Sequence, residues 1–289
     1  MRLKKFTVVF LFFFTLGSVF AQTRDSALFD HETYNNLPKK NPASTGVYER
    51  LPRSYSMKLF APLPGDQEHF GTCVGWAAAY AARTIAESIA LNRRNLTETT
   101  RNVFSPNYIY KSINPSDPQG LRGTHIYSAL DWMRDSGAVR MLDIERSTLF
   151  PNIDLSLFKD SRRYQIAGYV TLFSLDDDEE NKAALIIRMV KTSLSEGKPV
   201  IIGMNTPNSF IEARNVWKPE ESPQFFYGGH AVCVIGYDDS RFGGSFEIIN
   251  SWGRNWGNGG FMWIPYRVFT DFVLEAYEII EAPAVFNSP

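Results

Sequence analysis

One stretch of the sequence limits the fold more than any other: the alanine-rich segment over residues 73–91, which begins at Cys73. Alanine has the highest helix propensity of all residues, so this segment predicts a helix. Because its residues are apolar almost all round, we expect the helix to be buried at the centre of the molecule. Such burial needs a large core, and a chain of 289 residues with 44% hydrophobic content can build one.

Helical patterns dominate the first two thirds of the chain, and short apolar runs dominate the last third. Ser105-Pro106 predicts a helix start, and residues 124–136 place their apolar side chains on one helical face. The acidic residues 176–180 suit the N-terminus of another helix. The later apolar runs lie at 199–203, 231–235, 246–250, 260–264 and 276–280. Helices first and antiparallel strands later predict an α+β fold with two segregated halves.

The N-terminal residues 1–21 differ in character from the rest. Basic residues precede an apolar run over 6–16, and small residues follow up to Ala21. This pattern predicts a signal peptide cut after Ala21, and therefore a secreted or periplasmic protein. The alternative is a transmembrane anchor. A membrane span needs about 20 apolar residues and this run is shorter, so we expect no membrane anchor in the mature form.

The rest of the chain divides in two. Residues 22–50 are polar and contain prolines, which predicts an irregular N-terminal extension. Residues 51–289 are expected to form one domain, which we interpret as a monomer. The net charge of −1 and the lack of long runs of one sign do not indicate nucleic acid as a partner. The four histidines are scattered and there is no Cys-x-x-Cys motif, so we predict neither a metal site nor a cofactor.

Two cysteines, Cys73 and Cys233, leave two possibilities: one disulfide, or one reactive thiol and one bystander. The surroundings of Cys73 favour the second. It lies at the start of the predicted central helix, where the helix dipole lowers the pKa of a thiol. Cys233 lies inside an apolar strand, and its expected role is that of a small buried hydrophobic residue.

A nucleophilic cysteine needs a base, a group that orients the base, and donors for an oxyanion. Of the four histidines, His230 stands at the start of a strand after two glycines, so it is the best-held candidate base. Asn250 ends the next predicted strand and can accept a hydrogen bond from the imidazole without adding charge. Gln67, six residues before Cys73, offers a side-chain amide beside the backbone N–H of Cys73.

Taken together, these motifs resemble those of the papain-like cysteine peptidases. The resemblance runs over residues 51–280 and rests on four motifs in the family's order. They are Gln67 with Cys73 and Trp76, His230-Ala231-Val232, Ile235-Gly236-Tyr237, and Asn250-Ser251-Trp252-Gly253. The resemblance implies a two-lobed fold, protein or peptide substrates, and hydrolysis through a thioester, most simply as an endopeptidase. It also implies four substrate-binding residues: Gly123, Thr124, Ala231 and Trp252.

Some departures from the family pattern are informative. Val74 replaces the tryptophan that usually follows the nucleophile, which indicates a bacterial type of sequence. Residues 22–50 are too few to resemble the family's helical inhibitory prodomain. Two other functions stay open: a transglutaminase-like acyl transferase or amidase, and a non-catalytic binding module. Asn250 disfavours the first, which usually has an aspartate as third residue, and the complete set of four catalytic groups disfavours the second.

Overall fold

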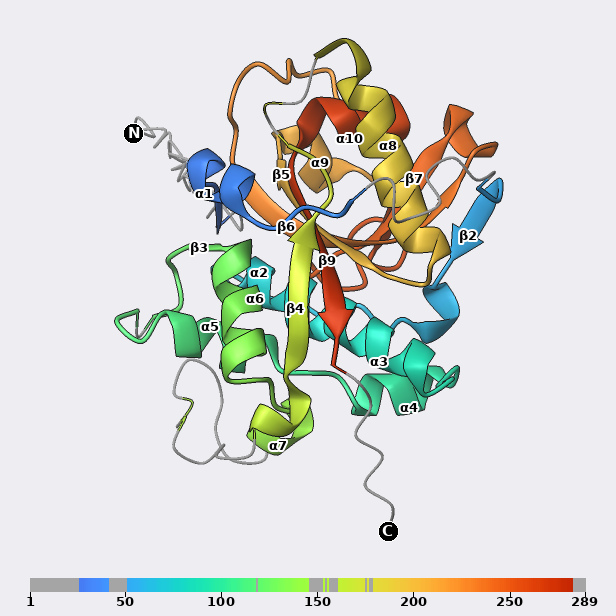
Figure 1. The fold of residues 1–289 in the computed structure, drawn as a ribbon. Coiled ribbons are helices and arrows are strands. Elements are labelled where there is room, and N and C mark those ends of the chain that lie inside the picture. Colours follow the sequence, from blue (N-terminus) through green and yellow to red (C-terminus); the bar gives the residue numbers. More distant parts are fainter. Residues whose placement is uncertain are drawn as a thin grey trace, which may run out of the picture.

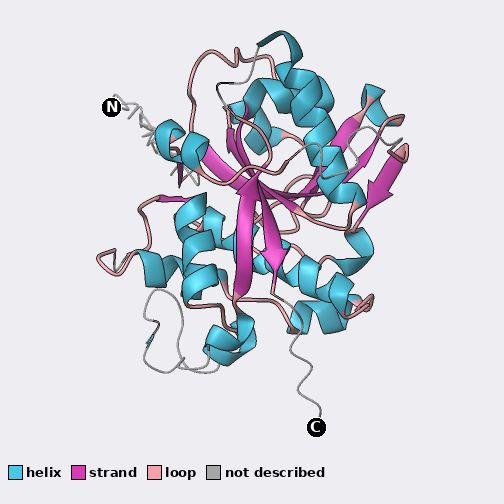
Figure 2. Cartoon of the chain, viewed as in Figure 1, coloured by secondary structure: helices cyan, strands magenta, loops and turns pink. Residues whose placement is uncertain are grey.

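The structure is a computed structural model that describes residues 26–41, 51–117, 119–145, 153, 155, 161–174, 176 and 179–282. The predicted signal peptide lies outside these residues. The described chain has two halves, one mainly helical and one built on a sheet (Figure 1). Helices also cover the sheet half, and two long strands reach from it into the helical half (Figure 2). The predicted α+β class is therefore confirmed.

The helical half is organised around one continuous helical run. It consists of α2 (Cys73–Gly75), a π-helical stretch η3 (Trp76–Arg83) and α3 (Thr84–Ala90), and every residue of α2 and η3 is buried. This is the central helix that the alanine-rich segment predicts. Gly75 lets α5 (Pro106–Ile113) approach closely, because a Cβ there would lie 2.4 Å from the Pro106 carbonyl oxygen.

Three further helices, α5, α6 (Ile126–Asp135) and α8 (Glu179–Ser195), follow the local signals of the sequence. Ser105 caps α5 by accepting a hydrogen bond of 3.1 Å from the Tyr108 backbone N–H, and Pro106 is the first helical residue. In α6 the buried residues fall on one face, as predicted. The acidic residues precede and begin α8. Four shorter helices were not foreseen: α4 (Leu96–Arg101), α7 (Met141–Glu145), α9 (Asn208–Glu212) and α10 (Tyr266–Phe272).

The sheet half contains an antiparallel sheet with the order β4-β9-β5-β6-β7-β8, and β2 (Ser54–Ser56) also pairs with β6. The predicted strands are all present, as β5 (Val200–Asn205), β6 (Gly229–Asp238), β7 (Ser245–Ile249), β8 (Phe261–Pro265) and β9 (Val273–Glu281). The short strand β2 was not predicted, and β4 (Ile166–Thr171) was missed as well. Its alternation is interrupted by a glycine, and its pairing with β9 is formed between distant parts of the chain.

The expectation that the N-terminal extension is irregular was wrong for residues 26–41. They form β1 (Ala27–Leu28), which pairs with β3 (Thr124–His125), and α1 (His31–Asn36), which Asp30 caps through a 3.0 Å bond from the Thr33 backbone N–H. Tyr34 of α1 is 0% exposed and belongs to the main core. These residues therefore pack as part of the domain.

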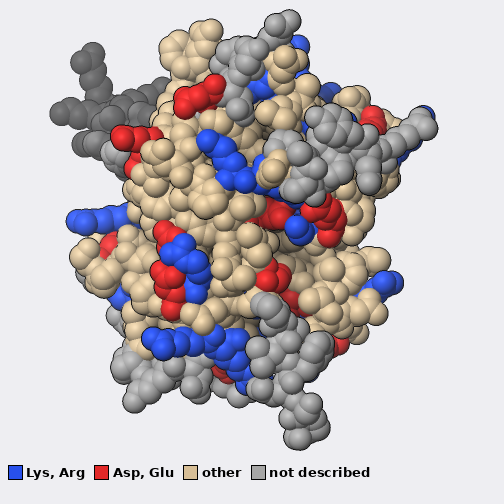
Figure 3. Space-filling view, viewed as in Figure 1, with Lys and Arg blue, Asp and Glu red and all other residues tan. Residues whose placement is uncertain are grey.

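Two surface properties bear on the expectations from composition. No helix among the described residues is long and apolar enough to cross a bilayer. On the face shown in Figure 3, acidic and basic side chains are interspersed over both halves of the molecule. Several of them form surface ion pairs, such as Arg134 with Asp131 at 2.8 Å.

Candidate active site

Cys73 is the first residue of the central helical run, and it is 0% exposed. Helical hydrogen bonding begins directly before it, since the Trp76 backbone N–H donates to the Thr72 carbonyl at 3.2 Å. The thiol therefore lies at the positive end of a helix dipole that is 18 residues long, counting from Cys73 to Ala90. This is the position that the sequence predicts for a reactive cysteine.

His230 and Asn250 come from neighbouring strands and meet directly. The His230 Nε2 and the Asn250 Oδ1 are 2.8 Å apart. Because an amide oxygen only accepts, the imidazole donates through Nε2 in this arrangement. The Asn250 oxygen also accepts from the Ser251 backbone N–H at 2.8 Å, which fixes the plane of the amide. The structure thus brings together two of the four groups that the sequence singles out.

Aromatic rings enclose the histidine. The Trp252 ring lies 4.5 Å from the His230 ring at an interplanar angle of 30°, and Phe210 meets His230 edge-on at 6.2 Å. His230 is 0% exposed and Trp252 4% exposed. A dry setting strengthens the bond between His230 and Asn250. Trp252 therefore packs against the His230 ring beside that bond, and its contact with substrate stays a prediction.

Gln67 is held by the residue that follows Asn250. Its Oε1 accepts from the Ser251 hydroxyl at 2.6 Å, and its backbone N–H donates to the Ser251 carbonyl at 2.8 Å. Its Nε2 donates to the Phe70 carbonyl at 2.8 Å. An amide nitrogen carries two hydrogens, so this bond does not exhaust it. Ser251 is a positioning residue that the sequence reasoning missed, although it stands within the Asn-Ser-Trp-Gly motif.

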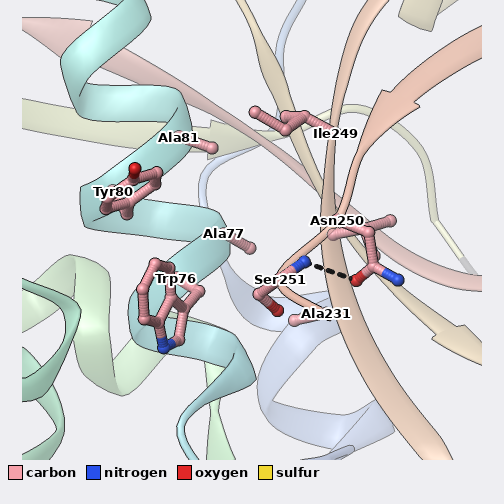
Figure 4. Close-up of a pocket in the computed structure, with 9 residues that line it drawn as sticks. Trp76, Ala77, Tyr80, Ala81, Ala231, Ile249, Asn250 and Ser251 are labelled. Atoms are coloured by element: carbon pink, nitrogen blue, oxygen red, sulfur yellow. Dashed lines mark hydrogen bonds between the residues drawn. The ribbon is translucent and has the colours of Figure 1, made fainter. Parts of the chain in front are cut away.

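The helix that carries Cys73 and the strand that carries His230 pack against each other. Between them they leave a cavity of about 10 Å³, where Ala77 and Ala81 of the helix point toward the side that carries Asn250 and Ser251 (Figure 4). Ala231 is fully buried and lines this internal cavity. Ala231 pairs with Gly203 of β5, and its contact with substrate stays a prediction.

The N-terminal residues 26–29 lie across the catalytic groups, and we call them the cleft segment. The Ser26 hydroxyl oxygen is 3.5 Å from the Cys73 sulfur, and the Ser26 carbonyl accepts from the Thr124 backbone N–H at 3.0 Å. Two glycines accommodate this close approach. A Cβ at Gly123 would lie 2.1 Å from the Ser26 carbonyl oxygen, and one at Gly229 would lie 2.0 Å from that of Ala27.

Phe29 of the cleft segment fills an apolar pocket. It lies over Gly203, where a Cβ would be 2.5 Å from its ring, and meets Phe226 edge-on at 6.1 Å. The open part of this cleft has a volume of about 720 Å³. Its lining includes Leu121, Gly123 and the loop 223–229. Of the predicted substrate contacts, Gly123 and Thr124 thus lie along the cleft.

The remaining cysteine is buried, as the sequence predicts. Cys233 is a free thiol with 0% exposure, and burial raises its pKa, so it stays protonated. Among the described residues, no three histidine, cysteine, aspartate or glutamate side chains are grouped as metal ligands would be.

Comparison with known proteins identifies the family. A family model described as papain family cysteine protease matches residues 65–272. The chain belongs to the papain family of cysteine proteases. The matched range contains Gln67, Cys73, His230 and Asn250, which the resemblance of the motifs had brought together.

Individual relatives agree with this assignment. A peptidase C1-like protein of Acanthamoeba polyphaga mimivirus is 30% identical over 71% of this chain and 65% of its own length. A cysteine protease of Blomia tropicalis is 24% identical over 80% of this chain and 66% of its own length. The chain thus spans just under two thirds of the length of these relatives.

A solved structure shows the same fold. Xylellain, a cysteine protease from Xylella fastidiosa, superposes with a TM-score of 0.67 at 21% identity, covering 89% of this chain and 95% of that one. The papain-like fold predicted from the motifs is therefore confirmed.

Proposed function

We propose that this protein is an exported cysteine peptidase that hydrolyses internal peptide bonds through a thioester intermediate. The observation that carries the proposal is the 2.8 Å contact between His230 Nε2 and Asn250 Oδ1, because the strand of His230 packs against the helix that begins at Cys73. This contact directs the other ring nitrogen, Nδ1, to act as the base.

The proposed reaction proceeds in two halves. His230 accepts the proton of the Cys73 thiol, and the thiolate attacks the carbonyl carbon of the peptide bond. The Cys73 backbone N–H and the Gln67 amide donate to the oxyanion that forms. His230 then protonates the leaving amine, which leaves an acyl-thioester on Cys73. Water, deprotonated by His230, hydrolyses that ester and restores the thiol.

Substrate backbone is proposed to bind along Gly123 and Thr124. The cleft segment supports this, because its own backbone already uses the Thr124 N–H as a hydrogen-bond donor. The cleft also accepts a chain that continues beyond it, since the segment runs on from Phe29 into α1. A cleft that tolerates a continuing chain suits an endopeptidase.

The form described here is proposed to be latent. The group beside the Cys73 sulfur is the Ser26 hydroxyl, which a thiolate cannot attack, and Phe29 fills the adjoining pocket. The cleft segment thus excludes substrate from the cleft but is not itself cleaved there. Residues 22–50 do not resemble a long inhibitory prodomain, yet four of them cover the nucleophile.

Export is proposed on the pattern of residues 1–21, with a mature chain that begins at Gln22. N-terminal sequencing of the protein recovered outside the cytoplasm tests this. A chain that still begins at Met1 rules out the signal peptide.

Labelling by an epoxide inhibitor of papain-like enzymes, with the modified residue mapped, tests the peptidase itself. The proposal expects the label on Cys73 and loss of peptide hydrolysis in Cys73→Ala, while Cys233→Ser keeps it. Turnover of a glutamine-amine acyl transfer substrate with no peptide hydrolysis would support the acyl transferase instead. If the protein lacking the cleft segment is neither labelled nor active on any of these substrates, a non-catalytic binding module is supported.

A further inference from the structure

A buried polar pair lies beneath the substrate edge of the proposed active site. Tyr110 of α5 is 0% exposed and Asp117 is 5% exposed. The Tyr110 hydroxyl donates to the Asp117 carboxylate at 2.6 Å, and its oxygen also lies against the Arg122 carbonyl. The proposed reaction assigns no step to either residue.

Asp117 holds the backbone of the loop that leads to the substrate edge. One carboxylate oxygen accepts from the Gly120 N–H at 3.1 Å, and the other accepts from the Arg122 N–H at 2.8 Å. Burial acts to raise the pKa of Asp117, but the bonds from Tyr110, Arg122 and Gly120 outweigh it and hold this pKa below its usual value. The carboxylate thus stays charged as a fixed acceptor.

The same loop is bound to the turn before the nucleophile. The Gly71 N–H donates to the Gly120 carbonyl at 2.7 Å. A Cβ at Gly71 would lie 2.6 Å from the Arg122 carbonyl oxygen, so only glycine allows this approach. The next residues along the loop are Gly123 and Thr124, which carry the backbone of the cleft segment.

We propose that Tyr110 and Asp117 are positioning residues for substrate binding: the pair fixes the Gly123–Thr124 edge at its distance from Cys73. The pair acts through the loop 120–122, which it links on one side to α5 and on the other to Gly71. Of the experiments that test this inference, only the measurements of peptide turnover depend on the proposed function.

The first test uses Tyr110→Phe, which removes the hydroxyl and keeps the ring. A loosened Thr124 holds Ser26 less firmly, so iodoacetamide should alkylate Cys73 of the full, unprocessed chain roughly threefold to tenfold faster, as the loss of about one buried hydrogen bond implies. For peptide turnover by the enzyme prepared from the same chain, we expect KM to rise by a similar factor while kcat changes less than twofold.

The matched control is Tyr237→Phe, which removes another buried tyrosine hydroxyl, bonded to the Pro52 carbonyl at 2.9 Å in the other half. A merely structural role predicts that both variants lose stability and that neither changes KM or alkylation. Equal alkylation rates and equal KM in the two variants would overturn the proposal.

The pH dependence of KM gives a second, independent readout. Asp117 has a lowered pKa in the folded protein, so its contribution is lost only when the pH falls through that low value. Without the Tyr110 hydroxyl the pKa of Asp117 rises, and the acid-side increase in KM should begin at higher pH. Asp117→Asn should remove this limb and raise KM at every pH. If the acid-side increase in KM begins at the same pH in Tyr110→Phe as in the wild type, the proposed role of the pair is contradicted.

Failure of this proposal and failure of the peptidase proposal are distinguishable. Alkylation of Cys73 requires no turnover, so a chain that cleaves no peptide still reports on the positioning pair. Faster alkylation in Tyr110→Phe and Asp117→Asn, with no change in Tyr237→Phe, supports the pair in either case. Should Tyr110→Phe fail to fold, Asp117→Asn carries the same comparison.

Discussion

Residues 26–29 and residues 30–41 are consecutive in the chain, yet they bind the rest of the protein in different ways. The cleft segment binds through backbone contacts to glycines and leaves Leu28 45% exposed. The second stretch, which we call the anchor segment, buries Tyr34 in the core and carries Lys40, 8% exposed and ion-paired to Glu278 at 2.7 Å. The cleft segment adds only the small side chain of Ala27 to the buried core, with Phe29 packed against it. We therefore expect its removal to cost the core less than removal of the anchor segment.

Substitution of one aromatic residue in each segment tests whether the two segments contribute differently to stability. The Tyr34 ring packs on Tyr277 and Phe173, and its hydroxyl bonds the Ala276 backbone. We expect Tyr34→Ala to lower the free energy of unfolding by about 3–5 kcal/mol, as other buried aromatic truncations do. Phe29→Ala, in a half-buried position, should cost about 1.5 kcal/mol. Urea unfolding of the two variants measures the difference, and equal losses would remove the distinction between the segments.

The junction of the two segments is predicted to respond to pH. Glu275 of β9 is 0% exposed, accepts from the Tyr277 hydroxyl at 2.8 Å, and receives the backbone N–H of Asp30. Burial raises the pKa of Glu275 to about 7, against 4.5 for a free glutamate, and the nearby Asp30 charge adds to the rise.

A raised carboxyl pKa favours the folded state at low pH. The contribution of Glu275 is full below about pH 4.5 and is lost as the pH rises to about 7, a change of about 3 kcal/mol. Unfolding measured from pH 4.5 to 8 should show this decline. Glu275→Gln, which cannot ionise, should flatten it. The same slope in wild type and Glu275→Gln would show that Glu275 is not the group responsible.

The smallest expected effect concerns access to the nucleophile. Phe29→Ala weakens the cleft segment by about 1.5 kcal/mol, so iodoacetamide should reach Cys73 roughly tenfold faster. Leu59→Ala, at a position that is 67% exposed, serves as control. An alkylation rate that Phe29→Ala leaves unchanged would mean that residues 26–29 do not guard the thiol.

The sequence predicted the parts of the molecule whose signals are local. The central helix, its start at Cys73 and the five later strands follow from propensity and periodicity over neighbouring residues. The anchor segment could not be predicted in this way. Tyr34 and Lys40 stand among polar residues, and their burial depends on β9, about 240 residues away.

The candidate site shows the same limit. Cys73, His230, Asn250 and Gln67 belong to motifs with a recognisable spacing. Ser251 belongs to such a motif too, but its bond to Gln67 exists only because the fold brings β7 beside the turn before the helix.

Turnover and thiol reactivity, measured together in Gln67→Ala and His230→Ala, test the central claim most directly. His230 stabilises the Cys73 thiolate, so His230→Ala should raise the pKa of that thiol and nearly abolish both alkylation at neutral pH and peptide hydrolysis. In the proposed reaction Gln67 acts by donating to the oxyanion, so Gln67→Ala should lower kcat by about a hundredfold or more and leave alkylation unchanged, because alkylation forms no oxyanion. If Gln67→Ala lost thiol reactivity as completely as His230→Ala, the assigned division of roles would be wrong.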